Sequence, residues 1–296
     1  MSDKKQGVVI ALGYFDCVHL GHREVINKAK ALAQKLNSQT AIFTFEGNLR
    51  SALGKGDEKF VYSLSERKAV FETINVDHVF FAPVTKEFLS NTAQEFLDFI
   101  NQKYNVLGYV CGKDFRFGKF GLGDINFLKQ YARERNQVVE IVEILTNDGV
   151  KISTSLIKTL LESGDIKKAN ALLGKNYTIK GQVFEDRKVG TTLGFPTVNV
   201  KTEKEKQQLK NGVYYGEIAV DGVSKKAVIN YGARPTFDLE ETLIEAHLID
   251  FSGNLYGKTI SIRFDGFLRE IQKFSSASEL ASQLEKDVDK VRNSND

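Results

Sequence analysis

The sequence has little of what marks secreted, membrane-bound or nucleic-acid-binding proteins. It contains two cysteines, Cys17 and Cys111, and its first apolar run, residues 8–12, is too short for a signal peptide or a membrane span. Its 41 basic and 38 acidic residues leave a net charge of +3, too even a balance to predict binding to DNA or to a membrane. We therefore expect a cytoplasmic protein that acts on small molecules, as a monomer or weak oligomer. Its thiols should be free, with a catalytic thiol as the alternative.

The composition suits a globular chain with two domains. Of the 296 residues, 42% are hydrophobic and 27% are charged. As far as Gly174, apolar strands alternate with helical patterns, which is typical of a parallel sheet with helices on both faces. Beyond it, short β-rich runs without intervening helices indicate an antiparallel barrel or sandwich, and residues 277–291 have helical spacing. We therefore expect domains over residues 1–174 and 175–296.

A glycine-rich turn, GYFDCVHLGH, joins the first strand to a helical pattern that begins at His22. A helix N-terminus favours an anion, and Gly13 and Gly21 allow the backbone to approach it closely. His19 and His22 stand three apart, so that their rings can converge on phosphate oxygens. The turn therefore predicts a triphosphate site. Two alternatives stay open, namely a transition-metal site made by Asp16, His19 and His22, or histidines that only cap the helix.

Two further stretches of the first domain carry candidate ligand contacts. The segment CGKDFRFGKFGLGD, residues 111–124, holds phenylalanines that can stack on flat rings and cations that can meet phosphates. Its alternative is a surface hairpin with a buried phenylalanine. Ser153, Thr154 and Ser155 precede an apolar helical pattern, and capping alone would explain them, at about 1 kcal/mol.

In the second domain, Thr197 and Asn199 are two apart on an extended segment and point the same way. Two neutral oxygen ligands in this arrangement suit a Mg²⁺ ion that keeps waters and nucleotide phosphates. The alternative is a turn with an Asx hydrogen bond. The charged residues 201–210 are interpreted as a solvated loop.

These motifs resemble those of bacterial FAD synthetases, two-domain enzymes that join an FMN adenylyltransferase to a riboflavin kinase. The turn is similar to the family's GxFDGxHxGH, the second stretch matches GxDFxFGxxxxGD, and STSLIK resembles SSTxIR. In the second half, GFPTVN and GARPTF resemble the flavokinase GFPTxN and GxRPTF. The resemblance implies a Rossmann-like nucleotidyltransferase domain with a parallel sheet, followed by an antiparallel β-barrel riboflavin kinase domain with a terminal helix.

In the first domain, the resemblance implies that FMN attacks ATP to give FAD and pyrophosphate, with His19 and His22 as catalytic residues. Phe45, Phe115 and Phe117 are implied to bind the flavin. The implied ATP-binding residues are Gly13, Phe15, Asp16, His19, His22, Gly112, Asp114, Ser153, Thr154, Ser155 and Lys158.

In the second domain, the resemblance implies that ATP phosphorylates riboflavin to FMN, with Glu245 as the catalytic base and Arg269 as a flavin contact. Thr197 and Asn199 are implied to hold Mg²⁺. The implied ATP contacts of this domain are Lys188, Gly190, Phe195, Thr197 and Asn199.

Three stretches depart from the family pattern. Only Thr44 and Phe45 remain of its TFxPHP segment, and Lys158 replaces an arginine, which removes a bidentate fork. Residues 185–191, EDRKVGT, stand where the family has HGxxxGR, and Asp186 places a negative charge where phosphate is expected. We therefore keep three alternatives: a monofunctional FMN adenylyltransferase with a degenerate kinase domain, a kinase with a disabled adenylyltransferase, and a non-catalytic flavin-binding regulator.

Overall fold

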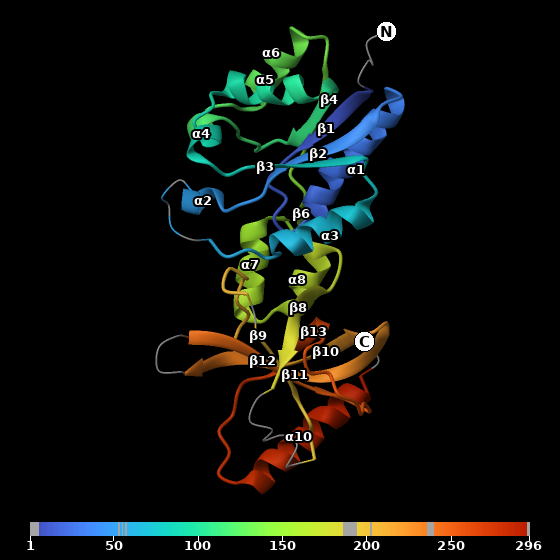
Figure 1. The fold of residues 1–296 in the computed structure, drawn as a ribbon, viewed down its shortest axis with the longest axis vertical. Coiled ribbons are helices and arrows are strands. Elements are labelled where there is room, and N and C mark those ends of the chain that lie inside the picture. The colour runs from blue at the N-terminus through green and yellow to red at the C-terminus, as the bar shows by residue number, and fades with distance from the viewer. Residues whose placement is uncertain are drawn as a thin grey trace. The chain divides into compact units, whose positions relative to one another are not determined.

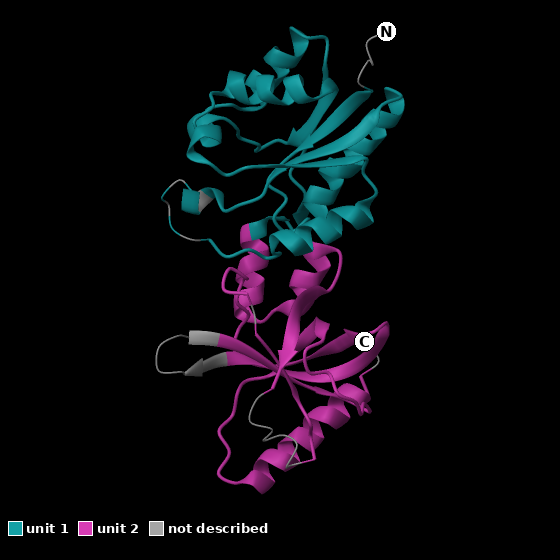
Figure 2. Cartoon of the chain, in the orientation of Figure 1, with its two compact units in different colours: residues 1–154 teal, residues 155–296 magenta. Residues whose placement is uncertain are grey.

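The computed structural model describes residues 6–52, 54, 56, 58–185, 194–201, 203–235 and 240–294. The chain divides into two compact units, Met1–Thr154 and Ser155–Asp296 (Figure 2). This division lies before the boundary expected at residue 174. Contacts of the preceding helices account for the difference. Glu162 accepts from Gln207 at 2.8 Å, and Asn170 of α8 (Ile166–Leu173) donates to the carbonyl of Phe264 at 2.9 Å and accepts from the backbone N–H of Tyr177 at 2.7 Å.

The first unit is built on a parallel five-stranded sheet with the order β3-β2-β1-β4-β5 (Figure 1). Helices α1 (Leu20–Lys35) and α3 (Leu64–Ile74) cover one face, and α5 (Ala93–Lys103) and α6 (Ile125–Arg133) cover the other. The predicted parallel sheet with helices on both faces is confirmed. Its strands are β1 (Gly7–Leu12), β2 (Gln39–Phe45), β3 (His78–Ala82), β4 (Asn105–Gly112) and β5 (Val138–Val142).

The alternation of side chains along β1 explains why this strand reads as a continuous apolar run. Val8, Ile10 and Leu12 pack in the core under α5 and α6, whereas Val9 and Ala11 pack in the core under α1 and α3. Because both faces of the strand are buried, neither set of positions can be polar. The sheet therefore has two separate hydrophobic layers.

The strand order places a binding crevice at a defined point. In an open parallel sheet, ligands bind beyond the carboxyl ends of the strands where the order reverses, here between β1 and β4. The turn that starts at Gly13 follows β1, and Gly112 to Asp114 follow the end of β4. Shorter elements surround this edge, namely α2 (Leu49–Ala52), α4 (Lys86–Leu89), the 3-10 turn η1 (Lys119–Gly121), β6 (Thr146–Asn147) and β7 (Val150–Lys151).

The second unit contains a closed antiparallel barrel with the order β10-β11-β12-β9-β8-β13 (Figure 1). The terminal helix α10 (Ala277–Arg292) packs on it through Val288 and Val291, which contact Val213 and Val228 in one apolar cluster. The predicted barrel and terminal helix are confirmed. The strands are β8 (Tyr177–Phe184), β9 (Val198–Lys201), β10 (Gly212–Val220), β11 (Val223–Pro235), β12 (Glu240–Leu248) and β13 (Thr259–Arg269).

The expectation of a solvated loop over residues 201–210 is wrong for part of that segment. Lys206, Gln207 and Leu209 are all buried. The ammonium of Lys206 lies 5.2 Å from the ring centroid of Tyr177, and the amide of Gln207 donates to Glu162 at 2.8 Å. A run of long polar side chains can bury its aliphatic stems, which composition alone does not reveal.

Across the described ranges, none of the helices is both long and apolar enough to span a membrane.

Candidate functional site

A cavity of about 680 Å³ lies in the first unit at the switch point of the sheet. Its walls come from the turn after β1, the segment after β4, and the hairpin of β6 and β7. Residues near 45–49 and 88–96 complete the lining, so the structure brings together five separate stretches of the sequence. Those of the predicted site that line it are Gly13, Phe15, His19, His22, Phe45, Gly112, Asp114, Phe115, Phe117, Ser153 and Thr154.

The turn between β1 and α1 carries backbone strain. Phe15 and Val18 have φ angles of 49° and 48°, a left-handed conformation that costs an L-residue roughly 1–2 kcal/mol. For a β-branched residue such as Val18 it is a marked outlier. Strain of this kind persists only where the surroundings hold the backbone firmly, and it concentrates at functional sites.

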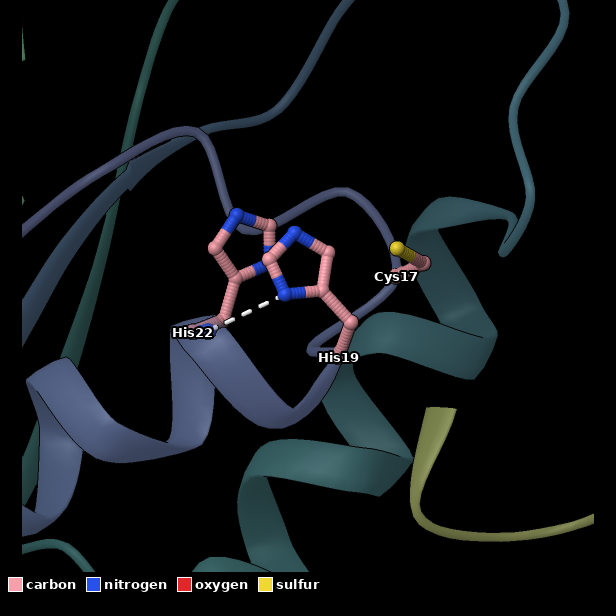
Figure 3. Close-up of side chains that lie close together, drawn as sticks. All are labelled: Cys17, His19 and His22. Carbon is pink, nitrogen blue, oxygen red and sulfur yellow. Dashed lines mark hydrogen bonds between the residues drawn. The ribbon is translucent and has the colours of Figure 1, made fainter. Parts of the chain in front are cut away.

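His19 is the N-cap of α1, and its Nδ1 accepts a hydrogen bond from the backbone N–H of His22 at 3.2 Å. The two rings are stacked, with centroids 3.6 Å apart and an interplanar angle of 15° (Figure 3). Gly21 permits this packing, because a Cβ there would lie 3.1 Å from Cε1 of His19. The capping alternative thus applies to His19. It also sets the neutral tautomer, since an accepting Nδ1 leaves the proton on Nε2.

Both histidines are held neutral. Burial lowers the pKa of His19 from 6.5 to about 4, with Lys151 adding to the effect, and burial also lowers the pKa of His22 well below 6.5. At neutral pH the pair therefore offers N–H donors rather than full positive charges. Donors fixed in a water-poor site need little reorganisation when charge develops on a substrate.

The metal alternative of Asp16, His19 and His22 has only a partial basis in the structure, because the group that comes together has Cys17 in place of Asp16. Cys17, His19 and His22 each offer a ligand atom, and these atoms lie within 4.8 Å of one another (Figure 3). Ligand atoms around a tetrahedral Zn²⁺ lie closer together, at about 3.3–3.8 Å. A metal on Nε2 of His19 would also force the ring proton onto Nδ1, against the N–H of His22. The arrangement therefore suits a phosphate better than a metal.

Part of the cavity wall is charged. Lys151 in β7 pairs with Asp114, and Lys113 pairs with Glu143 at 3.0 Å. Sequence reasoning missed Lys151, although it lines the cavity. Lys151 lies two positions before the hydroxyls of Ser153, Thr154 and Ser155. A cation so close to candidate phosphate contacts could have identified it from the sequence.

Aromatic side chains form the apolar part of the cavity. The rings of Phe115 and Phe117 are stacked with centroids 5.6 Å apart, and Phe45 and Phe88 also line the space. Phe117 is buried and pairs with Gly123 in an antiparallel bridge, so the hairpin interpretation holds for it as well. These side chains give the cavity an apolar part, and aromatic faces of this kind can stack on a flat ring.

Three predicted ATP contacts do not line this cavity. Asp16 is completely buried, and its Oδ2 accepts from the backbone N–H of Val61 at 3.5 Å. Ser155 and Lys158 lie on α7 (Thr154–Ser163) in the part of that helix that belongs to the second unit. Their contacts with ATP stay predictions.

A second cavity, of about 290 Å³, lies in the barrel unit. Phe195, Thr197, Glu245 and Arg269 line it, as predicted for one site. Thr197 Oγ1 donates to Glu245 Oε1 at 2.9 Å. Asn199 lies directly opposite Glu245 in the pairing of β9 and β12. The predicted base and the predicted oxygen ligands are therefore neighbours.

Asn199 supplies a test of whether this cluster suits a cation. Its Oδ1 is buried and has no hydrogen-bond partner within the described ranges of the chain. A buried acceptor without a donor is costly, and native proteins seldom leave one unsatisfied. A hard cation held by oxygen ligands would satisfy it, so the donor set fits Mg²⁺.

For Arg269, Lys188 and Gly190, the structure does not test the predicted ligand contacts. Arg269 forms a bidentate pair with Asp287, with Nη2 and Oδ2 2.7 Å apart, which ties β13 to α10. Its contact with a flavin stays a prediction. Lys188 and Gly190 lie outside the described residues.

Sequence reasoning also missed His247. Its Nδ1 lies 2.9 Å from the carbonyl of Pro196, so the ring nitrogen donates, and the ring meets Phe195 edge-on at 5.5 Å. His247 follows Glu245 by two positions on β12, which puts both on one face of the strand. That spacing was the signal in the sequence.

Comparisons with known proteins cover both units. The model of the FAD synthetase family matches residues 1–156, and that of the riboflavin kinase family matches residues 173–295. A bifunctional riboflavin kinase/FMN adenylyltransferase from Bacillus subtilis is 36% identical in an alignment of 284 residues that covers 94% of this chain and 90% of the relative. The protein of that name from Haemophilus influenzae is 33% identical, over 97% of this chain and 94% of its own.

One solved structure is similar along the whole chain. It is described as a macrolide-efflux protein from Streptococcus pneumoniae, and it superposes with a TM-score of 0.92 at 28% identity, over 100% of this chain and 96% of that one. Both units therefore have counterparts in one experimental structure.

Proposed function

The chain belongs to the family of bifunctional riboflavin kinase/FMN adenylyltransferases and makes FAD from riboflavin, and we propose that its two cavities are the two active sites. The observation that carries this proposal is the grouping of the predicted residues. Eleven of them line the first cavity, and Thr197 and Glu245 meet in the second. The product of the second cavity would be the substrate of the first.

In the first cavity, ATP would lie with its phosphates on the turn between β1 and α1. An oxygen of the FMN phosphate attacks the α-phosphorus, and the bond to the β-phosphate breaks to release pyrophosphate. Nε2 of His19 and the backbone amides of the turn would donate to the charge that develops on the phosphates. Phe45 and Phe115 would hold the flavin ring. Holding the FMN phosphate in line with the α-phosphorus of ATP would supply most of the catalysis.

In the second cavity, Glu245 would take the proton from the ribityl hydroxyl as that oxygen attacks the γ-phosphorus of ATP, and the bond to the β-phosphate would break to release ADP. The hydrogen bond from Thr197 holds one carboxylate oxygen in place. Oxygen atoms of Thr197 and Asn199 would hold Mg²⁺, which neutralises phosphate charge when bound. Phe195 would contact the nucleotide, since it lines the same space.

The proposal also covers the domain boundary, the cellular location and oligomeric state, and the choice between an active and a degenerate kinase. We place the functional boundary at residue 174, because the riboflavin kinase model begins at residue 173. We expect the enzyme in the cytoplasm, as a monomer or weak oligomer. Of the alternatives, an active kinase is favoured over a degenerate one by the Thr197–Glu245 pair and by the buried Oδ1 of Asn199.

The test is to incubate the purified protein with ATP and Mg²⁺, plus either riboflavin or FMN, and to separate the products by chromatography. Formation of both FMN and FAD from riboflavin supports two working sites. Formation of FAD from FMN, with riboflavin left unchanged, would mean that the departure at residues 185–191 has silenced the kinase. Binding of FMN without any turnover would support the regulator.

A further inference from the structure

Arg67 is an unusual residue to find beneath the phosphate-binding turn. It lies on α3, does not line the cavity, and is only 1% exposed. Its guanidinium is enclosed by the rings of Tyr14, Phe60 and Phe81, whose centroids lie 5.7, 5.7 and 5.9 Å from Cζ. Arginine is almost never fully buried unless something in the interior requires its charge or its donors.

The donors of Arg67 reach the strained turn. Nη1 donates to the carbonyl of Tyr14 at 3.4 Å, and the same carbonyl accepts from Thr44 Oγ1 at 2.6 Å. Tyr14 directly precedes Phe15, the first of the two residues with left-handed φ angles. Two side chains from different elements therefore fix the peptide at the start of the turn.

The charge of Arg67 acts on the same turn. Asp16 lies between the two strained residues and is completely buried. Attraction to Asp16 opposes the lowering of the pKa of Arg67 that burial causes. A cation below the turn and a carboxylate within it stabilise each other, and each makes the other's burial less costly.

The hydrogen bonding of Arg67 is incomplete. Its Nε is buried and has no hydrogen-bond partner in the part of the chain that the structure describes. An arginine that only stabilises the fold would be expected to have a partner for each N–H donor. A buried donor without a partner is typical of functional sites.

We propose that Arg67 is a positioning residue for adenylyl transfer, which holds the turn of Tyr14 to Val18 in its strained form so that His19 and the backbone amides face the ATP phosphates. The proposal rests on the proposed function of this cavity. Because Arg67 does not line the cavity, it would touch neither ATP nor FMN. Its effect should therefore appear in the use of ATP and leave the kinase reaction unchanged.

The experiment compares three variants of the full chain, Arg67→Gln, Arg67→Lys and Lys68→Gln. Lys68 is the matched control, because it is a cation on the same helix but is exposed. For each variant, kcat and KM for ATP and for FMN are measured in FAD synthesis, and FMN formation from riboflavin in the same protein serves as the internal reference. Thermal unfolding measures the folded fraction.

We expect Arg67→Gln to lower kcat/KM for ATP by about 10-fold to 100-fold, with KM for FMN and the kinase rate unchanged. Arg67→Lys should recover most of the loss, and Lys68→Gln should match the unchanged protein. An Arg67→Gln enzyme whose folded fraction keeps its kcat and KM for ATP would overturn the proposal, since stability alone would then explain the residue.

Thr44→Val keeps the proposal testable if Arg67→Gln does not fold. This nearly isosteric change removes the other hydrogen bond to the Tyr14 carbonyl. We expect it to lower kcat/KM for ATP on its own, and the double variant with Arg67→Lys to lose more than the product of the two single effects. Independent effects, or none, would contradict a shared role at that carbonyl. Absence of FAD synthesis from the unchanged protein would instead refute the proposed function.

Discussion

Thr197 and Glu245 are joined by a 2.9 Å hydrogen bond from Oγ1 to Oε1, although 48 positions separate them in the sequence. The bond connects the end of the segment that enters β9 to the middle of β12, and Asn199 faces Glu245 in the same pairing of strands. The carboxylate of Glu245 and the amide of Asn199 are thereby held on barrel strands, and the hydroxyl of Thr197 stands on the residue just before β9. This placement supports the proposed kinase site.

Glu245→Gln should stop FMN formation from riboflavin, because the amide cannot accept the ribityl proton. We expect the rate to fall by about 10²–10⁴-fold. FAD formation from added FMN should be unchanged, since it uses the other cavity. Chromatographic assay of both reactions checks this, with Glu285→Gln as a control on the exposed side of α10. A kinase rate within a few-fold of the original would remove Glu245 from the role of base.

His247→Ala should weaken the kinase through the Pro196 carbonyl, to which Nδ1 donates at 2.9 Å. Loss of this bond frees the segment that carries Thr197, and we expect kcat/KM for ATP to fall by about 10-fold or more. His247→Asn should restore much of the activity, because its amide N–H can donate from a similar position. Equal loss in both variants would show that the ring itself, and not this hydrogen bond, is what the reaction needs.

The first unit should lose stability in mild acid because of its buried histidines. Burial lowers the pKa of His19 from 6.5 to about 4. Between these two values, His19 is protonated in the unfolded chain but neutral in the folded one. Stability therefore falls as pH decreases through this window, by about 2 kcal/mol at about pH 5 for this residue. His19→Asn, which keeps an N-cap acceptor, should show a smaller drop in melting temperature between about pH 7.5 and about pH 5. An identical drop in both proteins would mean that His19 is not neutral in the folded state.

The two thiols should be unreactive in the folded protein. Cys17 and Cys111 are both buried, and burial raises the pKa of Cys111 to about 12. We expect alkylating reagents to label them only after denaturation. Cys17→Ser should retain both activities, because a hydroxyl can replace the thiol that lies 3.6 Å from Thr154 Oγ1. Rapid labelling of a single thiol, together with loss of one activity, would instead support the catalytic thiol.

Much of the architecture could be predicted because local patterns and tertiary packing agree. The observed limits of β3, β8 and β10 coincide with runs rich in β-branched and aromatic residues, and Thr92 with Glu95 forms the capping box that its spacing indicates. An extended segment was expected around Asn199, but β9 is only four residues long, too short for a periodicity that would fix its limits.

The features that were missed depend on contacts between distant segments. Nothing near Arg67 in the sequence shows that the Tyr14 carbonyl needs a donor, and nothing near Lys206 shows that the ring of Tyr177 will cover it. Asp16 was assigned to ATP from its place in the motif, whereas its complete burial is a property of the folded turn. Motif spacing thus identifies which residues gather at a site. It does not show which of them line the cavity and which are buried behind it.

The most direct test of two active sites in series is complementation between two inactive variants. His22→Ala should lower FAD formation by about 10²–10³-fold but leave FMN formation intact, and His78→Ala, on an exposed residue of β3, is its control. Given riboflavin, ATP and Mg²⁺, neither His22→Ala nor Glu245→Gln should make FAD alone, whereas a mixture of the two should, since FMN released by one is used by the other. FAD formed by either variant alone at a rate close to that of the unchanged protein, or no gain in the mixture, would contradict the assignment of the two cavities.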